Sequence, residues 1–145
     1  MSKVLVIYQS FGGSTKLLAE AAAVGVSQSG AEADIKDVTK VTADDLSDVD
    51  GIILATTQPF QSMAGDTKKL FEQLWLGRDK IRKGTPFATI ICYKTDPQAT
   101  QESLKMFADY LELKPTDDWL TVSADDIEAG KEQARQLGIA IVQGD

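Results

Sequence analysis

Histidine is absent from this 145-residue sequence, and cysteine occurs once, as Cys92. Histidine is the commonest general base and transition-metal ligand, so its absence excludes Ser-His and Cys-His nucleophile pairs. A single cysteine cannot form an internal disulfide, and a lone thiol that ends an apolar run is interpreted as an inert core thiol in a cytoplasmic protein. Any chemistry is therefore expected to come from a bound cofactor.

An excess of basic charge is also lacking, because 15 lysines and arginines face 22 aspartates and glutamates, for a net charge of −7. An acidic chain is a poor partner for nucleic acid. No apolar run approaches the roughly 20 residues of a membrane span, and the N-terminus has no apolar signal-peptide region. We expect one domain, residues 1–145, with no nucleic-acid or membrane partner.

What is present is an alternation of apolar runs and helical patterns, which is typical of an α/β fold with a parallel sheet. The first, third and fourth runs are apolar nearly throughout, as expected for strands covered on both faces. The second and fifth runs mix polar and apolar residues and are expected at the edges. Right-handed crossovers then give a doubly wound, five-stranded parallel sheet of order 2-1-3-4-5. The expected strands are 3–8, 33–38, 50–56, 86–93 and 118–123, and the expected helices are 14–29, 43–48, 65–76, 97–112 and 124–143.

Three local patterns predict helix starts. Thr42 with Asp45, and Ser123 with Asp126, have the spacing of an acidic capping box. Asp96 followed by Pro97 reads as an N-cap with proline in the first helical position.

A doubly wound sheet binds ligands beyond the carboxyl ends of its strands, which selects three loops. The first loop, between an apolar run and a helix start, is expected to bind phosphate. Unpaired amides open the helix, glycines allow close backbone approach, and the hydroxyls can donate. The alternative is an ordinary capped turn. Its residues are Ser10, Phe11, Gly12, Gly13, Ser14 and Thr15.

The second loop offers polar groups that can recognise the edge of a heterocycle, beside a phenylalanine that can cover its face. In the alternative interpretation, Phe60 and Met63 only tuck under the end of the sheet. The third loop offers Tyr93 for stacking and Lys94 to face negative charge, or else both side chains are merely solvated. The second-loop candidates are Thr56, Thr57, Gln58, Pro59, Phe60 and Gln61.

Other uses of such a sheet lack their residues here. A response-regulator receiver needs acidic groups after the first and third strands, where this chain has Gln9-Ser10 and Thr56-Thr57. A low-molecular-weight tyrosine phosphatase needs a cysteine and an arginine in the first loop, which has neither. G-x-G-x-x-G and Walker A motifs are also absent. A phosphate loop flanked by aromatics is best suited to the mononucleotide FMN.

Residues 3–20 resemble the opening of flavodoxins and of flavodoxin-like NAD(P)H:quinone or FMN reductases of the short-chain type. The family pattern [ST]-x-[TY]-G-x-[TI] is matched from Ser10 to Thr15 except at Gly12. The segments 62–68 and 83–86 are similar to family stretches before a helix and before the fourth strand. The resemblance implies that the first loop holds the FMN phosphate, that residues 56–61 wrap the ring and ribityl chain, and that Tyr93 and Lys94 close the other side.

The chain departs from the family at Gly12, in a second loop without glycine between Thr56 and Met63, and at Lys94 in the third loop. The preferred function is an FMN-dependent electron carrier, in which Asp66 and Asp96 are the nearest carboxylates by sequence. One alternative is an NAD(P)H-dependent FMN or quinone reductase. A second alternative is a flavin-free interaction module. Expected partners are a redox protein or NAD(P)H and quinone, with the chain a monomer or homodimer.

The reductase alternative gives a role to a basic stretch after the second loop, which could attract the phosphate of a pyridine nucleotide or an acidic partner. The other interpretation is a solvated helix face, which is the commoner case. The stretch comprises Lys68, Lys69, Arg78, Lys80, Arg82 and Lys83.

Overall fold

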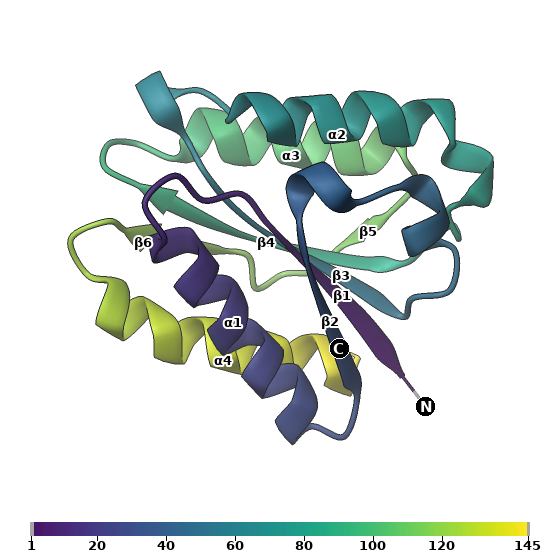
Figure 1. Cartoon of the computed structure of the whole chain (residues 1–145), viewed down its shortest axis with the longest axis horizontal. Coiled ribbons are helices and arrows are strands. Elements are labelled where there is room, and N and C mark those ends of the chain that lie inside the picture. Colours follow the sequence, from purple (N-terminus) through teal and green to yellow (C-terminus); the bar gives the residue numbers. More distant parts are fainter. Residues whose placement is uncertain (1, 145) are drawn as a thin grey trace.

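A parallel sheet runs through the middle of the molecule and carries helices on both faces (Figure 1). In this computed structural model residues 2–144 are described. The sheet order is β2-β1-β3-β4-β5, with β6 also pairing in parallel with β4. The predicted α/β class and strand order are therefore confirmed. The strands are β1 (Lys3–Tyr8), β2 (Glu32–Asp37), β3 (Gly51–Thr57), β4 (Pro86–Tyr93), β5 (Lys114–Pro115) and β6 (Leu120–Ser123).

Helices α1 (Ser14–Gln28) and α4 (Ile127–Gln143) cover one face, and α2 (Gly65–Leu76) and α3 (Gln98–Tyr110) cover the other (Figure 1). The helix expected over 43–48 is instead one turn of 3-10 helix, η2 (Ala43–Leu46), after η1 (Val38–Lys40). The link between β2 and β3 buries four apolar side chains, Val38, Val41, Leu46 and Val49, in or just after these two turns, so it needs no longer helix to cover the core. Two further 3-10 turns, η3 (Pro59–Gln61) and η4 (Arg78–Lys80), precede and follow α2.

The strand expected over 118–123 is split. β5 and β6 both pair with β4, but the four residues 116–119 lie opposite only two residues of β4. The backbone amide of Thr116 and the indole Nε1 of Trp119 both donate to the carbonyl of Phe87, each at 2.9 Å. This bulge lets Trp119 turn back onto the sheet, and its ring centroid lies 5.4 Å from that of Phe87.

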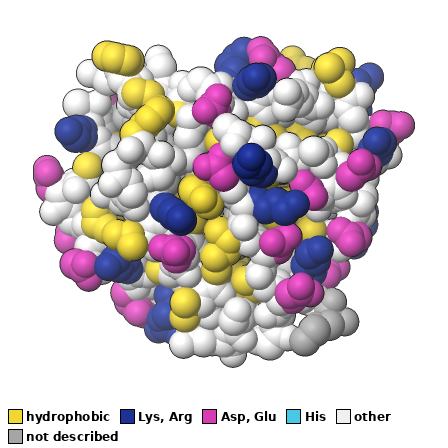
Figure 2. Space-filling model, in the orientation of Figure 1, with side chains coloured by type: hydrophobic (Ala, Val, Ile, Leu, Met, Phe, Trp, Pro, Cys, Tyr) yellow, Lys and Arg dark blue, Asp and Glu magenta, His cyan; other side chains and the backbone are white. Residues whose placement is uncertain are grey.

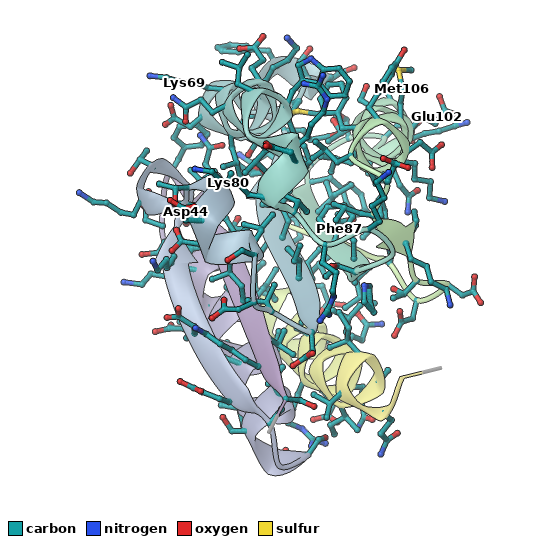
Figure 3. All side chains as sticks on the ribbon, turned by 90° about the vertical axis from the view of Figure 1, so that its right-hand side faces the viewer. Asp44, Lys69, Lys80, Phe87, Glu102 and Met106 are labelled. Carbon is teal, nitrogen blue, oxygen red and sulfur yellow. The ribbon has the colours of Figure 1, made fainter. Side chains whose placement is uncertain are left out.

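Two hydrophobic cores lie on the two faces of the sheet. In β1, Val4 and Val6 pack on the α1–α4 face, and Leu5 and Ile7 pack on the α2–α3 face, so both faces of the strand are apolar. The second core is rich in aromatics, and Figure 3 shows Phe87 between the sheet and the upper helices. Seven of the seventeen buried residues in the α1–α4 core are alanines, and these small side chains let the two helices approach closely.

Two of the predicted helix starts differ from the observed ones. The pattern at Asp96 and Pro97 is displaced by one residue: α3 begins at Gln98, so Pro97 is the N-cap and not the first helical residue. Asp96 Oδ1 accepts from the Gln98 amide at 2.9 Å from the position before the N-cap. The capping box expected at Ser123 and Asp126 is wrong, because α4 begins at Ile127. Ser123 Oγ instead accepts from the Asp125 amide at 3.2 Å and closes a turn ahead of the helix.

At η2, Asp45 accepts from the Thr42 amide at 2.8 Å, as the capping pattern predicts, and also from Lys36 Nζ at 2.9 Å. Burial raises the pKa of Asp45, but these hydrogen bonds and the lysine charge outweigh it and leave the pKa below 3.8. The ion pair ties the edge strand β2 to η2.

Replacing Asp45 with asparagine should lower the free energy of unfolding by about 1 kcal/mol near neutral pH, since it removes an ion pair and a charged cap. Because the folded pKa is depressed, the difference should persist above 3.8 and disappear as pH falls through the folded value. Urea unfolding of the wild type and the variant, once near neutral pH and once below the folded pKa of Asp45, measures the difference. Asp48→Asn, at an exposed position, is the control and should change stability by less than ~0.5 kcal/mol. A pH-independent loss in Asp45→Asn would contradict the role of its charge.

Candidate functional site

A cleft of about 550 Å³ opens where β1, β3 and β4 end, on the left-hand side of Figure 1. Its volume is in the range of about 300–1,000 Å³ typical of small-molecule sites. Hydrophobic side chains reach the surface over this region at the upper left of Figure 2. The cleft brings together all three predicted loops. It is lined by Ser10, Phe11, Gly12, Ser14, Thr15, Thr57, Gln58, Pro59, Phe60, Gln61, Cys92, Tyr93, Lys94, Thr95 and Ala124.

The first loop turns into α1 through Gly13, whose φ of 99° is left-handed and suits glycine. The Gly13 amide donates to Ser10 Oγ at 2.9 Å, which holds the loop closed. Gly13 provides no side-chain cap for α1, so the first amides of the helix stay available at the rim of the cleft. Gly13 itself shapes the backbone without lining the cleft. The helix dipole and these amides favour an anion here.

The second loop holds an aromatic ring away from the protein. Phe60 is 99% exposed, which excludes the alternative that it tucks under the sheet, whereas Met63 does pack against the α2–α3 core. Phe60 and Gln61 have φ values of 55° and 61°. Two successive non-glycine residues in the left-handed region cost roughly 1 kcal/mol or more each, and such strain concentrates at ligand sites. This loop has no glycine between Thr56 and Met63, so non-glycine residues adopt its left-handed backbone.

The side chain of Thr56, a predicted ligand contact, does not line the cleft. Successive residues of a strand point to opposite faces, so Thr57 faces the cleft while Thr56 is fully buried beneath it. The hydroxyl of Thr56 lies 2.8 Å from Thr67 Oγ1 in α2. Thr57 Oγ1 donates to the carbonyl of Cys92 at 3.2 Å and joins the second loop to the third.

Gln58 makes a second link between these loops. Its Nε2 donates to the backbone carbonyl of Asp96 at 3.0 Å, while its Oε1 is buried and accepts no hydrogen bond among the described residues. Leaving a buried acceptor unpaired costs about 1–3 kcal/mol.

Lys94 is the one charged residue that lines the cleft in the part of the chain described. Neither Asp66 nor Asp96 lines it, although they are the nearest carboxylates by sequence, and the Asp96 carboxylate instead accepts from the Gln98 amide. The site is therefore neutral to positive within a protein of net charge −7. Such a site favours an anionic ligand.

Cys92, Thr95 and Ala124 also line the cleft, although they were not among the predicted site residues. Cys92 is adjacent to Tyr93 at the end of β4, and this adjacency is the only sequence feature that indicates a place at the cleft. Burial raises the pKa of the Cys92 thiol, and a hydrogen bond with Thr15 only partly opposes this. The thiol is consequently protonated and inert, as the sequence predicts.

The basic stretch after the second loop does not reach the cleft. Lys68 pairs with Glu72 at 2.8 Å, and Lys80 lies 3.3 Å from Asp44, a pair visible in Figure 3. Arg82 and Lys83 also pair with carboxylates, and Arg78 stacks over the Trp75 ring at 3.9 Å. These contacts support the interpretation as a solvated face.

Two classes of site have no counterpart in the described residues. Nowhere in 2–144 do three or more cysteine, aspartate or glutamate side chains gather as metal ligands would. The same residues contain no helix with the length and hydropathy of a membrane span.

No family model matches the sequence. Among solved structures, a flavodoxin from the domain Archaea is similar with a TM-score of 0.84 at 20% identity, over 97% of this chain and 96% of that one. A flavodoxin, WrbA-like protein from Agrobacterium tumefaciens gives a TM-score of 0.81 at 17% identity, over 99% and 96% of the two chains. The flavodiiron protein from Giardia intestinalis gives 0.85 at 19% identity, over 99% of this chain and 36% of that one. With the observed strand order, these similarities show that the chain has the flavodoxin-like fold.

Proposed function

We propose that the cleft binds FMN and that the protein is an electron carrier. The observation that carries this proposal is the pairing, in one cleft, of a helix N-terminus opened by Gly13 with an exposed aromatic ring on a strained loop. Bound FMN would supply the electron-transfer chemistry. The flavodoxins among the similar structures support the choice of this cofactor.

The phosphate would be held by the first loop. Ser10 Oγ accepts from Gly13, so its own proton is free to donate to a phosphate oxygen. The amides at the start of α1 add further donors, and bonds to a doubly charged group are among the stronger ones. Gly12 has no side chain, and the space where its Cβ would lie is open within 4 Å, so a phosphate can approach the backbone there.

The ring would lie between the second and third loops. Phe60 and Tyr93 would cover its faces. Phe60 would also exclude water from the cleft once packed on a ligand. The loops are fixed to each other by Thr57 and Gln58, so little ordering would be needed on binding.

Titration with FMN tests this proposal. The purified protein should carry the visible flavin absorption bands or regain them on adding FMN, and it should quench FMN fluorescence with a Kd of about 1 µM or lower. A colourless protein that leaves micromolar FMN fluorescence unchanged would contradict the proposal. That result would favour the flavin-free interaction module.

The reductase alternative is tested in the same preparation, and the similarity to the WrbA-like protein gives a reason to do so. Steady-state oxidation of NADPH with a quinone acceptor would support an enzyme. Electron exchange with a redox protein, without such turnover, would support the carrier. The ion pairs of the basic stretch favour the carrier, because they leave few free cations for a pyridine nucleotide.

Lys94→Gln should lower the midpoint potential of the bound flavin by roughly tens of millivolts, because a nearby positive charge favours the more negative, reduced cofactor. The effect should weaken at high salt, since Lys94 is exposed. Lys69→Gln makes the same charge change on α2, away from the cleft, and is the control. Spectroelectrochemical titration measures both variants. Equal potentials for Lys94→Gln and the wild type would contradict this role.

A further inference from the structure

We propose that Gln9 is a positioning residue that fixes the separation between the first and second loops, and so matches the cleft to a ligand that spans both. This inference rests on the proposed function, since that ligand is FMN. We call Gln9, Thr56 and Thr67 the Gln9 clamp. None of the three residues lines the cleft.

The clamp is a chain of short, buried hydrogen bonds. Gln9 Oε1 accepts from the Thr67 amide at 2.8 Å and from Thr67 Oγ1 at 2.6 Å. Thr67 Oγ1 lies 2.8 Å from Thr56 Oγ1. Gln9 is 5% exposed, and both threonines are completely buried. Bonds in such a dry environment are stronger than in water, and unpaired members are costly.

The direction of these bonds follows from counting protons. Thr67 has one hydroxyl proton, and the carbonyl oxygen of Gln9 can only accept it. Thr56 is therefore the donor in its 2.8 Å bond with Thr67, which is shorter than its 3.4 Å contact with the Thr57 carbonyl, so the chain runs from Thr56 through Thr67 to Gln9. Gln9 is its terminal acceptor. Removing that carbonyl takes the acceptor away from the Thr67 hydroxyl and leaves the Thr67 amide only its longer bond to the Ala64 carbonyl, at 3.1 Å.

Two members of the clamp directly precede residues that line the cleft, and the third lies in α2. Gln9 immediately precedes Ser10 of the first loop, and Thr56 immediately precedes Thr57 of the second. Thr67 is in the first turn of α2, whose N-cap residue, Ala64, offers no side-chain acceptor. Gln9 supplies that missing acceptor across 58 positions of sequence. The clamp thus ties both loops to one buried point.

A fixed separation matters only for a ligand that contacts both loops at once. FMN would place its phosphate on the first loop and its ring on the second, so a preset spacing lowers the cost of binding it. Riboflavin, which lacks the phosphate, would use the second loop alone. Inorganic phosphate would use the first loop alone. Loss of the clamp should weaken the binding of FMN but not the binding of riboflavin or of inorganic phosphate.

The test compares Gln9→Leu with the wild type. The Kd for FMN should rise at least about tenfold, while the Kd values for riboflavin and for inorganic phosphate should change less than about threefold. Fluorescence quenching measures the flavins, and an NMR titration measures phosphate. Thr67→Val removes the hydroxyl bonds but keeps the amide bond to Gln9, so it should weaken FMN binding in the same direction as Gln9→Leu. Thr67→Ser, which keeps the hydroxyl, should bind FMN as tightly as the wild type.

The outcomes separate this inference from the proposed function. A wild-type protein that binds no FMN overturns both. FMN binding that survives Gln9→Leu and Thr67→Val overturns the clamp alone, and so does an equal weakening of all three ligands. If Gln9→Leu does not fold, the comparison of Thr67→Val with Thr67→Ser decides the matter.

Discussion

Gly138→Ala should lower the free energy of unfolding by about 2–3 kcal/mol and the melting temperature by roughly 10 °C. A Cβ atom at Gly138 would lie 2.1 Å from the Ala22 carbonyl oxygen, and one at Gly25 would lie 2.0 Å from the Arg135 carbonyl oxygen. Each clash is with backbone, so no side-chain rotation relieves it. The helices α1 and α4 would have to move apart and lose contacts along the alanine-rich core.

The sign of this effect is informative, because glycine to alanine inside a helix ordinarily stabilises by about 1 kcal/mol. Gly65→Ala is the matched control: Gly65 begins α2, and a Cβ there meets open space. It should leave stability unchanged or raise it by up to about 1 kcal/mol. Thermal unfolding followed by circular dichroism measures both variants. A Gly138→Ala protein as stable as the wild type would mean that the helices are less tightly packed than described.

If the first loop holds the phosphate, combined Ser10→Ala and Thr15→Ala substitutions should weaken the binding of FMN by about 1–3 kcal/mol, which is a rise in Kd of roughly 5- to 150-fold. Ser10 loses both the acceptor for the Gly13 amide and the free proton. Thr15 loses the buried hydroxyl that also faces Cys92. The measurement is the Kd of FMN by fluorescence quenching.

Riboflavin supplies the internal control for this double variant, because its affinity should not change. Inorganic phosphate distinguishes the variant from loss of the Gln9 clamp. Phosphate binding should be lost here, whereas it should persist in Gln9→Leu. Unchanged FMN affinity would place the phosphate elsewhere in the cleft.

The fold was predictable because the signals for it are local or periodic. Strands that read as apolar throughout, such as β1, do so because both faces are buried, and the mixed strand β2 lies at an edge. The split of the last strand was not predictable, since it depends on Trp119 reaching Phe87 across the sheet. The missed start of α4 has a similar cause: Ser123 has the capping composition, but its hydroxyl closes a turn instead.

The candidate site was predictable as three loops but not in its internal geometry. The rule that ligands bind beyond strand ends selects the loops, and the cleft joins them. Strand alternation at the end of β3, which turns Thr56 inward and Thr57 outward, depends on a register that sequence alone does not define. The left-handed backbone of Phe60 and Gln61 runs against residue preference. Gln9 and Thr67 meet only in three dimensions.

The bulge between β5 and β6 affects whether another strand can add to this edge of the sheet. The Lys114 and Thr116 amides point inward to β4, so the nitrogen of Pro115 faces outward and offers no proton to an incoming strand. The opposite border, β2, presents the charged residues Asp34 and Lys36. Borders of this kind resist the strand addition that starts aggregation. Strand addition is therefore disfavoured along β2 and at Pro115.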